Sequence, residues 1–421
     1  MKIGKLVLAL ALAGLTTPAL ATNGYLQHGY GVKAQGMAGV GIAMPQDALA
    51  AATNPAGMVM VGDRMDVGLV WFRPSRSAEL ETGFPPINGN YSANETRNFF
   101  IPEFGYNKML SPTMSFGVSV YGNGGMNTDY EKAIPLFGSS KPGVDLSQLF
   151  IAPTFAVQVA PGQALGVSLN LAYQRFKVTG LQNFTGPCPN CFSSSPGDVT
   201  NRGYDHSTGW SIKLGYTGKL SDTVTVGATY QSKTRMGEFD KYKGLFAGKG
   251  DFDIPETYGV GIAVKAMPAL TLAFDVQKID YSDVKSVGNK VDCLFAGQCQ
   301  IGSSNGAGFG WRDVTVYKLG ASYDYSKSLT LRGGLSTTRQ PIRSNQTLFN
   351  ILAPATVETH LTLGATWALS DKSELSLSYM HAFEKTVHGA NSVPAGGGFP
   401  GGNVNLKMYE DSLGIAYGLR F

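Results

Sequence analysis

Charged residues are scarce in this sequence, and long apolar runs are missing. Only 15% of the 421 residues are Asp, Glu, Lys or Arg, whereas soluble globular proteins carry about 25%. Beyond the first 21 residues, no stretch approaches the roughly 18 consecutive apolar residues that a transmembrane helix requires. The sequence therefore disfavours an ordinary cytosolic enzyme and excludes a helical membrane protein. A membrane β-barrel stays open, because its strands alternate apolar and polar residues and average to neutral hydropathy.

Motifs that carry enzyme chemistry or recognise nucleic acids are also missing. The five histidines form no HExxH motif, and the sequence contains neither GxSxG nor a phosphate-binding Walker motif. The net charge is +4 without a long basic run, so we expect no nucleic-acid partner. We also expect no catalytic residue, no metal and no cofactor. An outer-membrane lipid hydrolase is the enzyme alternative, but it needs a Ser–His or Asp–His pair at the barrel rim. His381 is a poor candidate because it shares the parity of residues that should face lipid.

The first 21 residues have the features of a secretory signal peptide. Lys2 and Lys5 supply the positive end, residues 6–15 form an apolar core, and Ala19-Leu20-Ala21 is a small-residue cleavage site. We therefore expect the mature protein to begin at Thr22 and to reach an oxidising compartment.

Export changes how the four cysteines are interpreted, because an oxidising compartment favours disulfides over metal ligands. Cys188 and Cys191 form a CxxC motif, and Cys293 and Cys299 lie six residues apart. Two local bridges are the preferred pairing among the three possible ones. A zinc site is the alternative, but the two pairs are far apart in sequence and no histidine is close to either.

Residues 22–63 do not alternate like strands and are interpreted as a separate N-terminal plug. Small residues and glycines dominate this segment, and Pro45-Gln46-Asp47 opens a short Ala-rich helix that stops at Asn54-Pro55. The glycine-rich run at 36–41 lacks the following Lys-Ser/Thr and the preceding strand of a phosphate loop. We therefore expect these glycines to permit close backbone packing in a confined space.

From residue 64 onward the pattern has the period of two that β-strands show. In the last segment Leu413, Ile415 and Tyr417 fall on one face, whereas Gly414 and Ala416 fall on the other. The same alternation predicts fourteen strands, near 64–73, 98–109, 112–124, 149–160, 164–179, 208–219, 223–235, 256–266, 269–282, 312–325, 328–340, 357–369, 373–385 and 408–421.

The connections between these strands alternate between tight turns and long loops, as they do in outer-membrane barrels. We therefore predict a 14-stranded antiparallel transmembrane β-barrel over residues 64–421, with both ends in the periplasm. A soluble β-sandwich is the alternative, but it needs no asymmetry of loop lengths. The terminal Phe421 matches the signal that barrel-assembly machinery reads, so this machinery is an expected partner.

The start of the mature sequence, above all the motif Asn54-Pro55-Ala56, resembles the FadL family of outer-membrane transporters for long-chain fatty acids and other hydrophobic compounds. The resemblance extends through residues 310–313, residues 378–381 and the final strand. It implies a barrel plugged by an N-terminal hatch. It also implies capture of the ligand in an apolar groove among the external loops, passage to an inner pocket, and sideways release through a gap at a kinked third strand.

The third predicted strand ends in a glycine-rich stretch that is the candidate for this kink. Gly122, Gly124 and Gly125 break side-chain packing and permit unusual backbone angles. Gly125 is the position that the resemblance aligns with the kink of the family. An ordinary glycine-rich entry into a loop is the alternative.

Strand parity predicts which side chains line the ligand route. With Tyr317 and Leu319 facing lipid, the opposite parity places Arg312, Val314, Val316 and Lys318 inside. The resemblance aligns Arg312 with a basic pocket residue, so it is the candidate partner for a carboxylate head group; an ion pair with Asp313 or with the plug is the alternative. Phe137, Leu245 and Phe246 are candidate residues of the external groove.

We predict passive uptake of long-chain fatty acids or other hydrophobic compounds by a monomeric barrel that lies in the bacterial outer membrane. Lipopolysaccharide and outer-membrane lipid are further expected partners, contacted by five basic loop residues: Lys233, Arg235, Lys241, Lys243 and Lys249. An uptake channel for aromatic or alkane hydrocarbons and a general diffusion porin are the alternative functions.

Overall fold

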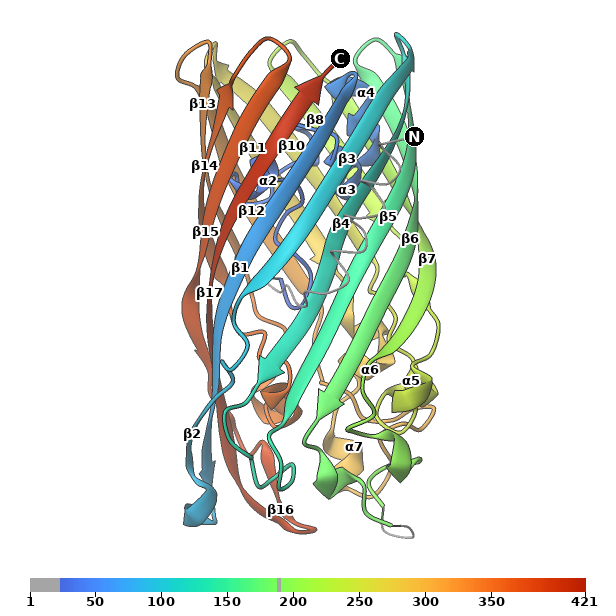
Figure 1. Cartoon of the computed structure of the whole chain (residues 1–421), viewed down its shortest axis with the longest axis vertical. Helices are drawn as coiled ribbons and strands as arrows, with labels where there is room; N and C mark the ends of the chain where they lie inside the picture. Colours follow the sequence, from blue (N-terminus) through green and yellow to red (C-terminus); the bar gives the residue numbers. More distant parts are fainter. Residues whose placement is uncertain (1–22, 188–190) are drawn as a thin grey trace.

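A computed structural model describes residues 23–187 and 191–421 of the chain. Fourteen long antiparallel strands form the wall of a barrel (Figure 1), and three short strands, β2 (Gly89–Ser92), β9 (Arg235–Met236) and β16 (Val393–Gly396), extend it at one end. The long strands are β1 (Arg64–Thr82), β3 (Phe99–Ser111), β4 (Met114–Asp129), β5 (Gly143–Ala160), β6 (Gln163–Thr179), β7 (Asp205–Lys219), β8 (Val224–Gln231), β10 (Thr257–Met267), β11 (Leu270–Ile279), β12 (Val314–Asp324), β13 (Leu329–Thr338), β14 (Thr359–Ala368), β15 (Ser373–Val387) and β17 (Phe399–Arg420).

The first and last strands close the barrel. β1 pairs with β17 along its whole length, from Arg64 opposite Arg420 to Thr82 opposite Gly402. Closure leaves no open sheet edge toward lipid, where an unpaired backbone group would cost several kcal/mol. This arrangement confirms the predicted fourteen-stranded antiparallel barrel.

Strand parity separates the outer surface from the lumen. On β6, Leu165, Val167, Leu169 and Leu171 are each 42–47% exposed, whereas the residues between them are mostly buried. On β12, Tyr317 is 48% exposed. The apolar stripe thus faces outward, as lipid requires, and the opposite face points into the bore. None of the described helices is long and apolar enough to cross a membrane.

Several predicted strand bounds were too short where strands leave the apolar band, whereas others were too long: β8 ends at Gln231 instead of near 235, and β11 ends at Ile279 instead of near 282. β1 continues to Thr82 instead of stopping near 73, and β17 begins at Phe399 instead of near 408. These extensions pair with each other, with β2 and with β16 at the end that carries the long loops. Their outward residues include Ser75, Ser77 and Glu79, so the apolar alternation fades while backbone pairing continues.

The N-terminal segment lies inside the barrel (Figure 1) and contains short helices: α2 (Val32–Gln35), α3 (Ala50–Thr53), the 3-10 turn η1 (Pro55–Gly57) and α4 (Met58–Val61). The predicted Ala-rich helix corresponds to α3, which ends at Thr53 with Asn54 as its C-cap, but it begins at Ala50 and not at the predicted opening at residues 45–47. The other helical elements lie in the long loops: η2 (Pro85–Ile87), η3 (Gln182–Phe184), η4 (Pro196–Asp198), η5 (Asp240–Tyr242), α5 (Ala247–Gly250), η6 (Tyr281–Asp283), α6 (Lys285–Gly288), α7 (Asp292–Phe295), η7 (Ser344–Gln346) and η8 (Phe349–Ile351).

Glycines on the lumen face of the wall let the N-terminal segment approach closely. Gly166 and Gly215 are directly opposite each other on β6 and β7. A Cβ atom on Gly215 would lie 1.9 Å from Asn54 Oδ1, and a Cβ on Gly166 would lie 2.3 Å from the backbone of Pro55. The Asn54-Pro55-Ala56 motif therefore rests on a spot of the wall that only glycine leaves free.

Buried ions join the N-terminal segment to the wall near the short turns. Lys33 of α2 forms an ion pair with Glu374 of β15, and Arg64 Nη2 lies 2.6 Å from both Asp66 Oδ1 and Glu374 Oε1. Asp66 Oδ2 in turn accepts a hydrogen bond of 2.9 Å from the backbone N–H of Ala48. These contacts connect the segment to β1 and β15 on the same side of the bore.

Candidate functional site

The long loops enclose an apolar pocket, which we call the loop pocket. It has a cavity volume of about 40 Å³. It is lined by Phe137, Val144, Phe176, Leu181, Phe184, Leu245, Phe246, Ser286, Ile301, Ala307, Gly308, Phe309, Phe349 and Leu352. The structure thus brings together Phe137, Leu245 and Phe246, the three residues that the sequence suggested for the groove. No charged side chain is among these lining residues.

The one polar side chain among the lining residues of the loop pocket, Ser286, is already hydrogen-bonded. Ser286 Oγ lies 2.6 Å from the backbone oxygen of Asp251 and donates to it. Burial and the neighbouring Asp253 raise the pKa of Asp251 from 3.8 to about 6. Asp253 accepts a hydrogen bond of 2.8 Å from the backbone N–H of Met236. The lining therefore suits an uncharged apolar group.

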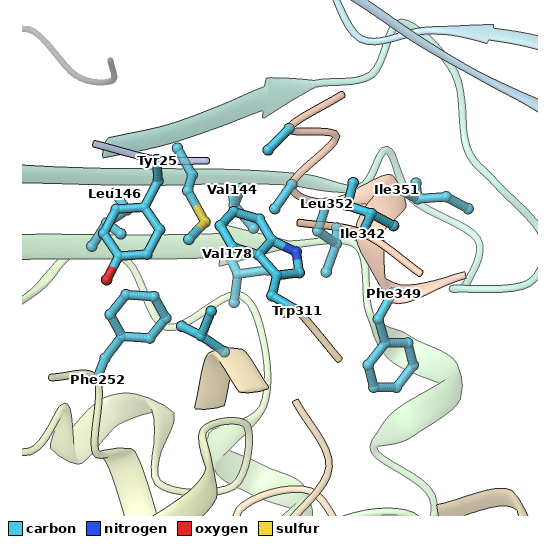
Figure 2. Close-up of a cluster of buried hydrophobic side chains, with 14 of the residues drawn as sticks. Tyr25, Val144, Leu146, Val178, Phe252, Trp311, Ile342, Phe349, Ile351 and Leu352 are labelled. Carbon is cyan, nitrogen blue, oxygen red and sulfur yellow. The ribbon is translucent and has the colours of Figure 1, made fainter. Parts of the chain in front are cut away.

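Aromatic residues of the loops pack on the start of the N-terminal segment. Tyr25, in the N-terminal segment, is fully buried and its ring centroid lies 5.3–5.9 Å from those of Phe252, Tyr281 and Trp311. Figure 2 shows Tyr25, Phe252 and Trp311 in this cluster with aliphatic residues from the strand ends and loops. Tyr281 also donates a hydrogen bond to the backbone oxygen of Asn23. The start of the N-terminal segment thus forms the floor below the loops.

A second pocket, which we call the inner pocket, lies between the N-terminal segment and strands β4, β7, β8, β10, β11 and β12. It has a cavity volume of about 30 Å³. It is lined by Leu26, Gly29, Tyr30, Gly39, Ile42, Ala52, Thr53, Asn123, Lys213, Thr229, Gln231, Thr257, Asp275, Gln277 and Lys318. Three of these side chains are ionisable acids or amines, which distinguishes this pocket from the loop pocket.

The two lysines of the inner pocket are bound by neutral acceptors. Lys213 donates to the backbone oxygen of Ala52, and Lys318 donates to Gln277 Oε1 at 3.1 Å. Asp275 Oδ2 accepts the backbone N–H groups of residues 41 and 42 at 2.8 and 3.0 Å. Among the described residues, no ion pair joins Asp275 to either lysine. Two amines and one carboxyl therefore share the pocket without direct contact.

The predicted lining residues of β12 divide into two groups. Val314, Val316 and Lys318 are buried and face the lumen, as parity indicated. Arg312 lies before the start of β12, and its Nη2 and Nε atoms donate to the backbone oxygens of residues 342 and 341 at 2.7 and 3.4 Å. It lines neither of the two pockets. The strand begins two residues later than predicted, so parity does not extend to Arg312.

The predicted kink positions coincide with a β-bulge in β4. Gly122 pairs with Leu149 of β5 and Gly124 pairs with Gln148, so Asn123 between them has no partner of its own in this ladder. A bulge bends a strand and increases its twist. Asn123 also lines the inner pocket, so the bend and the pocket lie together.

Beside the bulge, the ladder between β3 and β4 ends early. It reaches Phe104 opposite Val120 and extends no further among the described residues, although β3 continues along β1 to Phe99 and β4 continues along β5. Residues 99–103 of β3 and 121–126 of β4 therefore are not paired with each other, and we call this region the wall gap.

The N-terminal segment covers the wall gap from inside. Leu26 forms an antiparallel bridge with Gly124, and the N–H of Gly125 donates to the backbone oxygen of Tyr25 at 2.9 Å. On the other side of the gap, Glu103 accepts the N–H groups of residues 31 and 32 at 3.2 and 3.0 Å. Movement of this segment would therefore uncover an unpaired part of the wall. The glycines of the third predicted strand marked this region in the sequence, but strand periodicity carries no signal for the interrupted ladder.

One of the two predicted disulfides is present in the described residues. Cys293 and Cys299 are bonded, with an S–S distance of 2.05 Å. The predicted pairing of Cys188 with Cys191 involves Cys188, which lies outside the described residues. Residues 293–299 adjoin Ile301 of the loop pocket, whose N–H donates to the backbone oxygen of Phe192. Within the described part of the chain, no group of three or more His, Cys, Asp or Glu side chains could hold a metal.

Solved structures with this architecture include outer-membrane channels. The toluene transporter TodX of Pseudomonas putida has a TM-score of 0.70 at 19% identity, covering 94% of this chain and 99% of that one. A Pseudomonas aeruginosa FadL homologue has a TM-score of 0.69 at 16% identity, and the Ralstonia pickettii toluene transporter TbuX 0.64 at 18%; each covers 94% of this chain and 99% of the other. At such identities the likeness shows the fold alone.

A comparison with curated protein sequences gives no match. A family model described as outer membrane protein transport protein (OMPP1/FadL/TodX) matches residues 13–420. This match covers nearly the whole chain and agrees with the resemblance seen in the Asn54-Pro55-Ala56 motif. The chain therefore belongs to the OMPP1/FadL/TodX family of outer-membrane transport proteins.

Proposed function

We propose that the protein is a passive transporter that takes hydrophobic compounds with an acidic head group, such as long-chain fatty acids, into the outer membrane. One observation carries the choice of cargo: the inner pocket is lined by Lys213, Lys318 and Asp275, which carry two positive charges and one negative charge when ionised. A carboxylate bound there would balance the charge and form charge-assisted hydrogen bonds with the amines. We therefore assign the binding of the carboxylate head group, which the sequence predicted for Arg312, to Lys213 and Lys318.

The energetics of such transport require no coupled energy source. A chain of about 16 carbons gains on the order of 12 kcal/mol when it leaves water, at ~0.8 kcal/mol per methylene. The barrier is the charged saccharide layer outside, which an apolar protein route bypasses. The loop pocket would receive the cargo first because it is uncharged and lies among the external loops, and the inner pocket would then bind the head group.

The wall gap supports sideways release as the last step. An opening there would lead from the neighbourhood of Asn123, in the inner pocket, to the lipid beside β3 and β4. A fatty acid leaving by this route would avoid the aqueous periplasm, where it would lose the free energy of burial. The N-terminal residues 25–27, which cover the gap, would have to move first.

Uptake of aromatic hydrocarbons is the second candidate function. The uncharged loop pocket, lined by several phenylalanines, favours it, and the solved structures with similar folds include toluene transporters. A neutral hydrocarbon would gain nothing from Lys213 or Lys318. The lysines therefore distinguish the two cargo classes.

Measuring oleate and toluene uptake in parallel tests this proposal. In cells that depend on this protein for uptake, replacing both Lys213 and Lys318 by methionine should lower oleate uptake roughly 100-fold or more, because two charged hydrogen bonds of roughly 1.5–3 kcal/mol each are lost. Toluene uptake should stay unchanged. Lys327→Met, in a short turn on the periplasmic side, is the matched control. Equal oleate uptake by the double variant and the parent would contradict the assignment, and preferred uptake of toluene by the parent would favour the second function.

The proposed location and partners are those of an outer-membrane barrel. We propose that the chain is exported by residues 1–21, that residues 22–63 act as the plug, and that the protein works as a monomer in the outer membrane. Phe421 stacks on Tyr106 with ring centroids 5.8 Å apart and is the proposed signal for barrel-assembly machinery. The basic loop residues, Lys233 among them, are proposed to contact lipopolysaccharide phosphates.

A further inference from the structure

Two ionisable side chains face the lumen near the wall gap and belong to neither pocket. Arg76 of β1 is 2% exposed and Glu410 of β17 is 0% exposed. Glu410 is directly opposite Pro74, and Arg76 is opposite Met408. Arg76 and Glu410 are therefore diagonal neighbours on the same face of an antiparallel pair, at a spacing that long side chains can bridge.

Both side chains leave polar atoms unused. Neither oxygen of Glu410 has a hydrogen-bond partner, and neither does Nε of Arg76. The rest of the guanidinium is occupied: Nη1 donates to the backbone oxygen of Asn127 at 2.6 Å and Nη2 to that of Thr96 at 2.5 Å. Between these two described residues no nitrogen and oxygen come within 4.0 Å of each other. Buried polar atoms are rarely left in this way, because each one costs free energy.

The position of Arg76 connects this pair to the wall gap. Its guanidinium lies 5.9 Å above the ring of Phe99, which is the first residue of β3 and one end of the gap. Its bond to Asn127 reaches β4, on the opposite side of the gap. Arg76 thus spans from β1 to β4 where β3 has ended.

The surroundings of Glu410 are apolar. Ala382 of β15 is its neighbour on the other side. Phe72, Phe99, Met380, Ala382 and Met408 belong to one buried cluster that lines this part of the bore. Proline and alanine on either side of the carboxyl are small, so a ligand group could reach it without displacing a large side chain.

The unused atoms define the chemistry of a group that would fit between them. Such a group must accept a hydrogen bond from Arg76 Nε and donate one to Glu410. A hydroxyl does both, as does a carboxylic acid in its protonated form, whose carbonyl accepts and whose O–H donates. A plain hydrocarbon does neither.

We propose that Arg76 and Glu410 form a binding site for the hydroxyl-bearing head group of the cargo, either an alcohol, a phenol or a protonated carboxylic acid, at the wall gap. This inference rests on the proposed sideways release, because only a cargo that leaves through the wall gap would meet Arg76 and Glu410 as its last polar contact before lipid. It also assigns the protein a preference for hydroxylated cargo over the corresponding hydrocarbon at this step.

Uptake of toluene and p-cresol tests the site, because the two compounds differ by one hydroxyl group. In cells that take up both through the unmodified protein, Glu410→Leu should lower p-cresol uptake roughly tenfold, the value of one hydrogen bond to a charged group, and leave toluene uptake unchanged. Glu410→Gln keeps an acceptor oxygen and should lose less. Glu384→Leu is the matched control, because Glu384 is 52% exposed and pairs with Lys407 outside the lumen.

The outcomes separate this inference from the function on which it rests. Equal losses for both compounds in a barrel that still migrates as folded in an unheated gel would assign Glu410 a structural role. Unchanged uptake of both compounds would mean that the pair binds an ordered water only. Either result overturns the inference and leaves the transport proposal intact. If the unmodified protein accelerates entry of neither compound nor of oleate, the proposed function itself fails.

Discussion

Asn54 is the residue whose loss should most directly loosen the N-terminal segment. Its Nδ2 lies 2.7 Å from the backbone oxygen of Ile42, 2.9 Å from that of Tyr216 and 3.1 Å from Thr217 Oγ1. Its Oδ1 accepts the N–H of Ala56 at 3.1 Å. Two of these contacts reach β7 of the wall, and the other two hold the segment's own turn.

The magnitude of the Asn54→Ala effect follows from these bonds. Because Nδ2 carries two hydrogens, the amide makes about three full hydrogen bonds, each with a net value of about 0.5–1.5 kcal/mol. The loss should lower the free energy of local opening by about 2–4 kcal/mol. At 1.4 kcal/mol per factor of ten, the open population should rise roughly 30-fold to several hundred-fold.

Thiol labelling can measure this opening. Ala51, which is fully buried beside Asn54, would be replaced by cysteine, and maleimide labelling would be followed in both backgrounds without reductant. The described native cysteines are all bonded and do not react. Labelling should accelerate by the factor above in Asn54→Ala and stay constant in Asn305→Ala, an exposed loop control. Equal labelling rates with and without Asn54 would refute the seating of the motif on the wall.

Three further changes have defined outcomes. Gly215→Val should produce the same faster labelling as Asn54→Ala, because its Cβ would lie 1.9 Å from Asn54 Oδ1. Gly124→Val should expose the N-terminal residues to protease, since its Cβ would lie 2.2 Å from the backbone oxygen of Tyr25; unchanged protection would contradict the gap cover. Because burial raises the folded-state pKa of Asp251 to about 6, the fold binds its proton more tightly than the unfolded loop does. Loop stability should therefore fall as pH rises from about 4 through 6. Proteolysis of the loop should be slower near pH 5 than near pH 7.5, and Asp251→Asn should remove the difference.

Strand number and parity could be predicted from the sequence because lipid imposes a period of two on outward residues. The predicted inward positions of Val314, Val316 and Lys318 follow from this rule alone. The ends of β1 and β17 could not be predicted, because beyond the lipid band the outward residues are polar and the period disappears. The predicted inward position of Arg312 was wrong. This residue precedes the strand by two residues, and its side chain binds loop carbonyls instead of facing the bore.

The pockets depend on contacts between distant segments, which periodicity does not encode. Phe137, Leu245 and Phe246 are recognisable in the sequence as apolar loop residues, but they meet only because two loops fold toward each other over the barrel. The wall gap could not be predicted from the sequence, because periodicity does not show which pairs of neighbouring strands stop pairing early. The glycines at 122, 124 and 125 indicated a place of weak packing. The sequence did not indicate that β4 is unpaired with β3 there, or that the N-terminal segment pairs with Gly124 instead of β3.

The central claim is that the barrel is plugged along its axis and open to hydrophobic compounds through its wall. Reconstituted liposomes test it when entry of oleate and entry of a small sugar are measured in the same preparation. We expect the protein to accelerate oleate entry into the bilayer while sugar entry stays at the rate of protein-free vesicles. Rapid sugar entry with no acceleration of oleate would identify an open aqueous pore and contradict the account.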